Sequence, residues 1–559
     1  MRSFWGCALL VFATACTASA QEANWGEGTL IPPDGRANPY YLTGREHMTA
    51  VRAGKLHTQI YPIEISGTLP PLRPIVEFLD LEDRGNILRD FLRTFFSGFS
   101  KIHSFDDILN WLGLHPYPAE TETGVFAVPY PNNVRPDYRM GLGMIDTNNG
   151  LAFTFSCVAC HSSNLFGKTV LGLTNRFPRA NDLFIKAGAV LPFTNSHFFK
   201  WSSGATEGER LLLVRAKDNI ASVGVKEPSA FGLDTSLAQV ALSLAKRNPD
   251  SYATKNADLE ITPRNEALGF NVADSKPAVW WNLKYKNRWL SDGSIVSGNP
   301  VITNILWNEI GRGSDLMELE DWIKHNQQKI IELTSAVFSI EPPRFTDFFP
   351  PERINLNLAK RGQEIFGQRC AKCHGQYEKG WNQPNAENLS LSDQLKTFHV
   401  TYSPQTKVRN VGTDPNRYLG MRSLEQLNNL AISQEFGILV RPQTGYVPPP
   451  LVGIWARWPY FHNNSIPNLC AILTRASDRP KVFFTGEAND RERDFDLACN
   501  GYPTGEKTPT EWKTRKHRYN TRHDGLGNMG HDEGIFLRNG KELLTPDDKY
   551  ALVQFLQSL

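Results

Sequence analysis

The chain has 559 residues, of which 40% are hydrophobic and 21% are charged, so it can bury the cores of roughly two to four domains. The formal net charge is only +2 and the charged residues do not form blocks, which gives no reason to expect a nucleic acid or a membrane surface as a partner. After residue 20, no stretch approaches the length of about 18 apolar residues that predicts a transmembrane segment.

Residues 1–20 have the features of an export signal. Arg2 supplies a positive charge, residues 5–15 are mostly apolar, and Ala18–Ala20 resembles a signal-peptidase site. We therefore expect cleavage after this segment and a protein that is periplasmic or secreted. Lipidation at Cys16 is the alternative.

Residues 21–115 are rich in Pro, Gly and turn pairs. This composition predicts an N-terminal extension that wraps the rest of the chain, with one helix over residues 80–96. An N-terminal haem domain is expected over residues 116–345. Within it, the alternating residues 150–156 are typical of a strand, and apolar periodicity predicts helices over residues 207–221, 236–246 and 316–337.

Two Cys-x-x-Cys-His motifs predict two covalently bound c-type haems. The first haem motif consists of Cys157, Cys160 and His161, and the second haem motif consists of Cys370, Cys373 and His374. In such a motif the two cysteines attach to the vinyl groups of haem, and the histidine binds the iron from one face. A zinc or redox site rarely carries this histidine twice in one exported chain, so we prefer haem.

Proline pairs at residues 342–343 and 350–351 predict a linker between two domains. The C-terminal cytochrome c domain is expected over residues 352–559. An amphipathic helix over residues 358–366 leads directly into the second haem motif, as at the start of a cytochrome c domain.

The chain is expected to close with a helix over residues 550–556, because Thr545 is a good N-cap and a proline follows it. The predicted fold is mainly α, with two cytochrome c-like haem domains, long loops, a wrapping extension and little β-structure.

The eight cysteines also suggest a disulfide. Cys7 and Cys16 leave with the signal, and four others belong to the haem motifs. Only Cys470 and Cys499 remain, and in an oxidising compartment a bridge between them is the simplest expectation. Two separately buried thiols are the alternative.

Residues 449–469 resemble the signature of the bacterial di-haem peroxidase superfamily, which includes cytochrome c peroxidases, MauG-like enzymes and rubber oxygenase (RoxA-like) cytochromes. Residues 527–531, followed by the closing helix, are similar to the ending of the RoxA-like branch. A weaker match is residues 274–284, which are similar to a Trp-containing element between the haem motifs of that branch. The long interval between the motifs is also closer to the rubber oxygenases than to the compact peroxidases.

The resemblance implies that His531 is the second axial ligand of the C-terminal haem, opposite His374. A surface turn residue is the alternative for His531, and Met529 is a further candidate ligand, since Met/His ligation occurs in electron-carrying cytochromes. His462 lies inside the strongest signature, and we assign it a supporting role beside the haem.

The N-terminal haem, with His161 as its proximal ligand, is expected to bind dioxygen or peroxide on its other face. The group on that distal side is not identified. Glu266 and His197 are candidates for moving a proton there. Trp280 and Trp281 are candidates for relaying electrons, with core packing as the alternative, which also applies to Trp289.

The leading hypothesis is a haem-dependent oxidoreductase that oxidises or cleaves a hydrophobic organic substrate, as a rubber oxygenase-like dioxygenase does. One alternative is a di-haem cytochrome c peroxidase that reduces H2O2 with electrons from a small donor cytochrome or cupredoxin. A second alternative is a di-haem electron carrier without enzymatic activity, in which both irons are six-coordinate. The resemblance identifies a scaffold and leaves the substrate open.

Overall fold

The computed structural model describes residues 23–80, 104–234, 236–246 and 274–559. The predicted export signal, Cys16, Glu266 and most of the predicted helix over residues 80–96 lie outside the described residues. Among the described residues, no helix combines the length and the apolar character that a membrane span requires.

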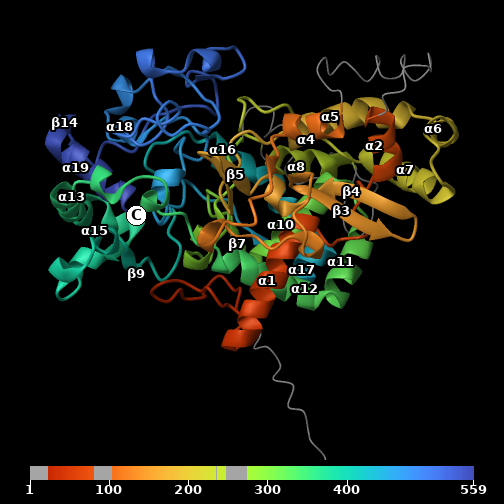
Figure 1. The fold of residues 1–559 in the computed structure, drawn as a ribbon, viewed down its shortest axis with the longest axis horizontal. Coiled ribbons are helices and arrows are strands. Elements are labelled where there is room, and N and C mark those ends of the chain that lie inside the picture. Colours follow the sequence, from red (N-terminus) through yellow and green to blue (C-terminus); the bar gives the residue numbers. More distant parts are fainter. Residues whose placement is uncertain (1–22, 81–103, 235, 247–273) are drawn as a thin grey trace, which may run out of the picture.

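Helices make up most of the regular structure, as the sequence predicts (Figure 1). The principal helices are α1 (Gly44–Ile60), α2 (Leu72–Asp80), α4 (Phe105–Trp111), α5 (Ala180–Val190), α6 (Ser196–Ser203), α7 (Glu207–Ile220), α8 (Ser236–Lys246), α10 (Pro300–Gly311), α11 (Leu316–His325), α12 (Gln327–Ser339), α13 (Leu356–Arg369), α14 (Ala371–His374), α18 (Leu469–Ile472) and α19 (Pro546–Gln557). In Figure 1, α13, α18 and α19 lie on one side of the molecule and α2, α6 and α7 on the other.

Within the described residues, every sheet is a two-stranded antiparallel ladder. The pairs are β1 (His115–Pro116) with β2 (Arg139–Met140), β3 (Leu142–Thr147) with β4 (Gly150–Phe155), β5 (Ser162–Leu165) with β6 (Lys168–Leu171), β7 (Ile295–Ser297) with β10 (Leu439–Val440), β8 (Gln376–Lys379) with β9 (Thr397–Thr401), β11 (Val482–Phe484) with β12 (Arg518–Asn520), and β13 (Leu537–Arg538) with β14 (Lys541–Glu542). The expected strand before the first haem motif is β4. The motif therefore lies between two hairpins, β3–β4 and β5–β6.

The predicted helices over residues 207–221 and 236–246 are confirmed as α7 and α8. The single helix predicted over residues 316–337 is wrong, because the chain breaks at Asn326 into α11 and α12. Asn326 leaves the helical region (φ −117°, ψ 32°), and its side-chain amide donates to the Trp322 carbonyl at 2.8 Å, which ends α11. Asparagine favours such a local side-chain bond over the helix interior.

The two helices predicted in the C-terminal part lie within α13 and α19. α13 contains the predicted amphipathic helix and runs directly into Cys370. Thr545 caps α19: its hydroxyl accepts from the Asp548 N–H, and the Asp548 carboxylate accepts from the Thr545 N–H.

Helix α1 was not predicted, because its apolar positions are few and do not form a clear stripe. It packs so closely along α12 that a Cβ on Gly54 would lie 1.9 Å from the Glu332 carbonyl oxygen. Residues 44–60 therefore contribute a packed helix to the structure, although the sequence suggested a loop-rich extension there. The only sequence signal is the capping pair Thr43 and Glu46.

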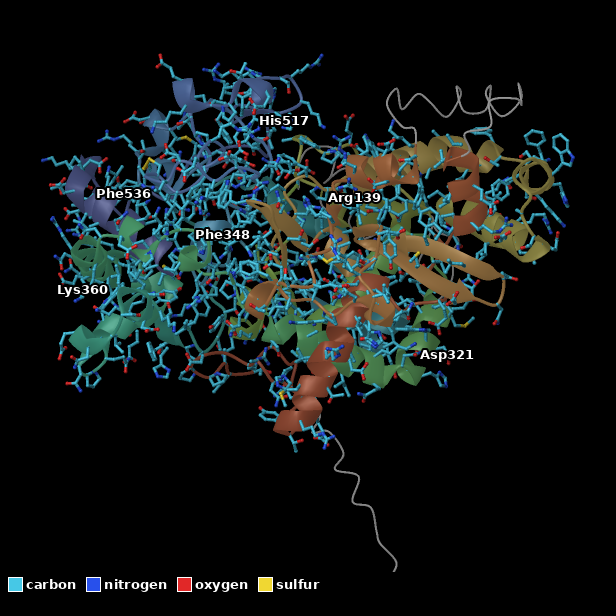
Figure 2. All side chains as sticks on the ribbon, in the orientation of Figure 1. Arg139, Asp321, Phe348, Lys360, His517 and Phe536 are labelled. Carbon is cyan, nitrogen blue, oxygen red and sulfur yellow. A yellow bond between two sulfur atoms is a disulfide. The ribbon has the colours of Figure 1, made fainter. Side chains whose placement is uncertain are left out.

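One continuous cluster of buried residues joins the two halves of the chain. Phe348, near the middle of the molecule in Figure 2, packs against Phe126 from the N-terminal half and Trp455 from the C-terminal half. The ring centroids are 5.4 and 5.5 Å apart. This shared core holds the surroundings of the two haem motifs at a fixed spacing.

Candidate functional site

A cavity of about 830 Å³ lies inside the protein, and both haem motifs line it. None of the four motif cysteines is in a disulfide. Burial raises the pKa of Cys157 to about 11 and those of Cys160 and Cys370 to about 12. Thiols that perform redox exchange have lowered pKa values instead. Among the described residues, no group of three or more His, Cys, Asp or Glu side chains is arranged to hold a metal ion. These two observations favour haem attachment over the redox and zinc alternatives.

The first haem motif is oriented by a backbone carbonyl. The ring nitrogen Nδ1 of His161 lies 2.8 Å from the carbonyl oxygen of Ala278, so Nδ1 carries the proton and donates it. Burial lowers the pKa of His161 to about 4, which keeps the imidazole neutral. A neutral imidazole whose Nδ1–H is held by a carbonyl presents Nε2 as a metal ligand.

The second haem motif repeats this arrangement. Nδ1 of His374 lies 2.8 Å from the carbonyl oxygen of Pro449, and burial lowers the pKa of His374. Both proximal histidines are thus prepared in the same way to bind iron through Nε2.

His531 lies opposite His374 across the cavity, with ring centroids 6.2 Å apart and ring planes inclined by 58°. An iron about 2 Å from one nitrogen of each ring would separate those nitrogens by about 4 Å and the centroids by roughly 6 Å, given usual metal–imidazole bond lengths. Burial and the charges of His374 and Arg479 lower the pKa of His531 to about 3, so this imidazole is also neutral, as ligation requires. The residues fit a haem iron held between two histidines.

The backbone that carries His531 is constrained. His531 has a φ of 57°, a conformation that non-glycine residues rarely adopt, and its N–H donates to the Val411 carbonyl at 2.8 Å. Gly530 precedes it at φ 75°, where a Cβ would lie 2.4 Å from the Val411 oxygen. A close approach to Val411 therefore requires glycine at this position.

The side chain of Arg479 binds the backbone of the segment that carries His531. Its guanidinium is 2% exposed and donates to the carbonyls of Asn528 at 2.6 Å and Gly530 at 2.7 Å. It also donates to carbonyls of the α18 region, namely those of Ala471, Ile472 and Thr474. Arg479 therefore ties the residues just before His531 to α18.

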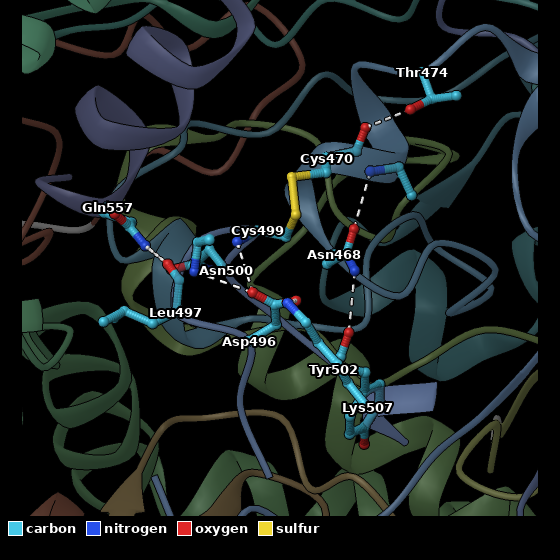
Figure 3. Close-up of a disulfide and its surroundings, with 12 residues drawn as sticks. Asn468, Cys470, Thr474, Asp496, Leu497, Cys499, Asn500, Tyr502, Lys507 and Gln557 are labelled. Atoms are coloured by element: carbon cyan, nitrogen blue, oxygen red, sulfur yellow. Dashed lines mark hydrogen bonds and ion pairs between the residues drawn. A yellow bond between two sulfur atoms is a disulfide. The ribbon is translucent and has the colours of Figure 1, made fainter. Parts of the chain in front are cut away.

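Cys470 and Cys499 form a disulfide next to these contacts (Figure 3). Their Cα atoms are 5.0 Å apart. Cys470 belongs to α18, and the side-chain amide of Gln557 in α19 donates to the Leu497 carbonyl at 2.7 Å. The disulfide and this hydrogen bond connect α18 and the closing helix through the 496–500 segment.

Trp280 and Trp281 contact the surroundings of both motif histidines. The Trp280 ring contacts the His161 ring, with centroids 5.1 Å apart, and Trp281 donates from Nε1 to the Val452 carbonyl at 2.9 Å. Val452 is three residues from Pro449, which accepts from His374. The two imidazoles are therefore joined by a short path of backbone and three hydrogen bonds.

His462 lines the cavity but forms no side-chain hydrogen bond within the described residues. Its ring stacks on Tyr446 with centroids 4.0 Å apart, and its carbonyl accepts from the Lys276 N–H. Burial, with the charges of Arg417 and Lys276, lowers the pKa of His462 to about 3. It faces the haem space as a neutral side chain, and the imidazole opposite His374 is that of His531.

The other candidates lie away from the cavity. Met529 is 50% exposed, and His197 is exposed on α6. Trp289 is buried in the core, where its Nε1 donates to the Gly298 carbonyl and its ring packs against Trp25. None of these three side chains lines the cavity.

Sequence reasoning missed three cations at or near the cavity, of which Arg479 and Lys286 are buried and Arg457 is half-buried. Arg479, Arg457 and Lys286 look like ordinary surface charges in the sequence. In the structure, Arg479 and Arg457 donate to backbone carbonyls, and Lys286 lines the cavity. Neither environment produces a recognisable pattern in the sequence. The one available signal was that Arg457 and Arg479 lie in or close after the recognised stretch at residues 449–469.

Comparison with known proteins agrees with these sites. Residues 445–484 match the model of the RoxA-like, cytochrome c-like family. The uncharacterized protein y4iJ of Sinorhizobium fredii is 25% identical over 503 residues, which cover 77% of this chain and 80% of that protein. The uncharacterized protein y4iM of the same organism is 26% identical over 325 residues, which cover 52% of this chain and 62% of that protein. The segment at residues 445–484, which contributes Tyr446, Pro449, His462 and Arg479 to the site, is RoxA-like and cytochrome c-like, and it indicates haem c as the cofactor.

Proposed function

We propose that the protein is an exported di-haem c-type oxidoreductase, with a reactive haem at the first motif and an electron-transferring haem at the second. The observation that carries this proposal is the difference between the two histidine environments. His374 faces His531, whereas the ring beside His161 is that of Trp280, and no second imidazole pairs with His161 in this way among the described residues. An iron with an open axial position performs chemistry, and an iron with two strong ligands mainly passes electrons.

When bound, haem supplies the redox chemistry with dioxygen or peroxide. The residues that line the cavity determine which molecules can approach the haem of the first motif. Leu112, Leu114 and Phe155 line the cavity and pack around Ala159 of the first motif, and Phe184 of α5 adds a further apolar surface. This apolar wall supports a hydrophobic organic substrate, oxidised or cleaved with O2 as in a rubber oxygenase-like dioxygenase.

Asp234 supports the alternative of a peroxidase. It lines the cavity near Cys160, and burial raises the pKa of its carboxyl to about 7. Its oxygens accept from the backbone N–H of Asn181 at 3.1 and 3.3 Å, which fixes its position. A carboxyl that titrates near neutral pH can move the proton that peroxide cleavage needs.

Electrons would reach the first motif through the segment at residues 278–281. Trp281 and its hydrogen bond to Val452 connect the surroundings of His161 with those of His374. A small donor cytochrome or cupredoxin would supply these electrons in the peroxidase, and such a relay would serve a dioxygenase only to return the iron to its reduced state.

Product analysis separates the candidate reactions. The holoprotein is incubated with O2 and a rubber latex without peroxide, and in parallel with H2O2 and a reduced donor cytochrome. Carbonyl-ended fragments from the latex support the dioxygenase, and rapid peroxide consumption supports the peroxidase. Asp234→Asn should slow only the peroxide reaction. Neither activity in protein that carries two haems would refute the enzyme and leave an electron carrier.

A further inference from the structure

Two cations, the buried Lys286 and the half-buried Arg457, line the cavity, and no acidic side chain among the described residues pairs with either of them. Lys286 is 8% exposed, and both side chains line the cavity. Burial and the neighbouring charge of Arg457 lower the pKa of Lys286 to about 8, and burial lowers the pKa of Arg457 to about 10. Two like charges in a low-dielectric interior are costly unless an anion joins them.

No carboxylate of the described residues forms an ion pair with either cation. Arg457 uses one guanidinium nitrogen to donate to the Pro450 carbonyl at 3.2 Å, and no side chain that the structure describes accepts a hydrogen bond from the Lys286 ammonium. By contrast, Lys284, two residues before Lys286, does not line the cavity and pairs with Glu341 at 2.6 Å. Among the described residues that line the cavity, Arg and Lys side chains far outnumber the acids, which are Asp234 and Glu533. The cavity wall is thus electropositive and suited to an anion.

Both cations lie on the segments that position the second haem motif. Arg457 donates to the Pro450 carbonyl at 3.2 Å, and the carbonyl of the preceding residue, Pro449, accepts from Nδ1 of His374 at 2.8 Å. Lys286 directly follows the short helix over Trp280–Tyr285, whose Trp281 donates to the Val452 carbonyl, three residues after Pro449. The pair therefore lies beside the haem space of the second motif.

We propose that Lys286 and Arg457 form a carboxylate-binding site that holds a propionate of the haem attached at Cys370 and Cys373. The haem brings its carboxylates into the cavity, and one of them supplies the missing counter-charge. An ammonium and a guanidinium together can donate several hydrogen bonds to one carboxylate. This inference rests on the proposed function, because it requires a haem at the second motif.

The test is the reduction potential of each haem in Lys286→Met and Arg457→Met, measured by spectroelectrochemical titration of the full chain. Reduction adds a negative charge to haem, so a nearby cation favours the reduced form. Loss of either cation should shift the low-spin haem to a more negative potential and leave the other haem unchanged. Resonance Raman bands of the propionates should change in the same variants. Lys286→Arg should keep both the potential and the Raman bands close to those of the unaltered protein.

Lys284→Met is the matched control, since it removes a lysine from the same segment but not from the cavity. Its potentials should equal those of the unaltered protein. Unchanged potentials and propionate bands in Lys286→Met and Arg457→Met, with both haems attached, would overturn this inference alone. If the unaltered protein does not carry two haems, the proposed function fails and this inference fails with it. If Arg457→Met does not fold, Lys286→Met decides the question.

Discussion

Replacement of Arg479 by methionine should release His531 from the second haem. Arg479 gives two hydrogen bonds to the residues just before His531, at 2.6 and 2.7 Å, from a guanidinium that is almost fully buried. A hydrogen bond from a charged donor contributes about 1.5–3 kcal/mol, so the loss of both bonds should remove about 3–6 kcal/mol of the stabilisation that holds this segment in place. Because His531 has a strained φ, the released backbone should relax away from the position that faces His374.

The assay is EPR and optical spectroscopy of haem-loaded Arg479→Met. One low-spin haem should become high-spin, and a second haem should then bind carbon monoxide in the reduced protein. Arg475→Met is the matched control, because Arg475 donates to the Gly540 carbonyl and does not touch residues 528–530. Two fully loaded haems with an unchanged low-spin signal in Arg479→Met would refute the role assigned to this arginine.

Three further predictions concern the relay, the disulfide and pH. Trp281→Phe removes the hydrogen bond to Val452 and should slow electron transfer between the haems several-fold, measured after flash photolysis of the half-reduced carbon monoxide complex; an unchanged rate would exclude this route. Replacing Cys470 and Cys499 by serine should lower the free energy of unfolding by about 3–4 kcal/mol for a 29-residue separation, measured by urea denaturation; a loss below about 1 kcal/mol would contradict it. Burial and the charges of Arg176 and Arg139 lower the pKa of His115 to about 4 in the folded protein, whereas its pKa in the unfolded chain is about 6.5. Between these two pH values the folded state therefore binds fewer protons than the unfolded state. Stability should therefore fall by up to about 3 kcal/mol as the pH drops from about 6.5 to 4, and His115→Gln should flatten this dependence in denaturation curves; an equally steep dependence in His115→Gln would exclude His115 as its source.

The parts of the site that the sequence predicts are those encoded by local spacing. The two haem motifs, α13 before Cys370 and the Thr545 cap of α19 each depend on neighbours within a few residues. His531 was assigned by resemblance, and the structure brings its ring to 6.2 Å from that of His374. Its ligation of iron stays a prediction.

The parts that the sequence did not predict depend on contacts between distant residues. Arg479 donates hydrogen bonds to carbonyls about fifty residues away in the chain. The sequence does not distinguish such a buried arginine from an exposed one. Helix α1 is stabilised by its close packing on α12 more than by its own apolar pattern. The break at Asn326 lies within a continuous periodic pattern, so only the local side-chain hydrogen bond reveals it.

The most direct test of the account is EPR of the oxidised holoprotein combined with carbon monoxide binding to the reduced protein. We predict two haems per chain, of which one is low-spin with two histidine ligands and does not bind carbon monoxide, and the other, at His161, is accessible and binds it. Loss of the accessible haem in a Cys157→Ala, Cys160→Ala variant would assign it to the first motif. Two low-spin haems that ignore carbon monoxide and peroxide in every redox state would contradict the account.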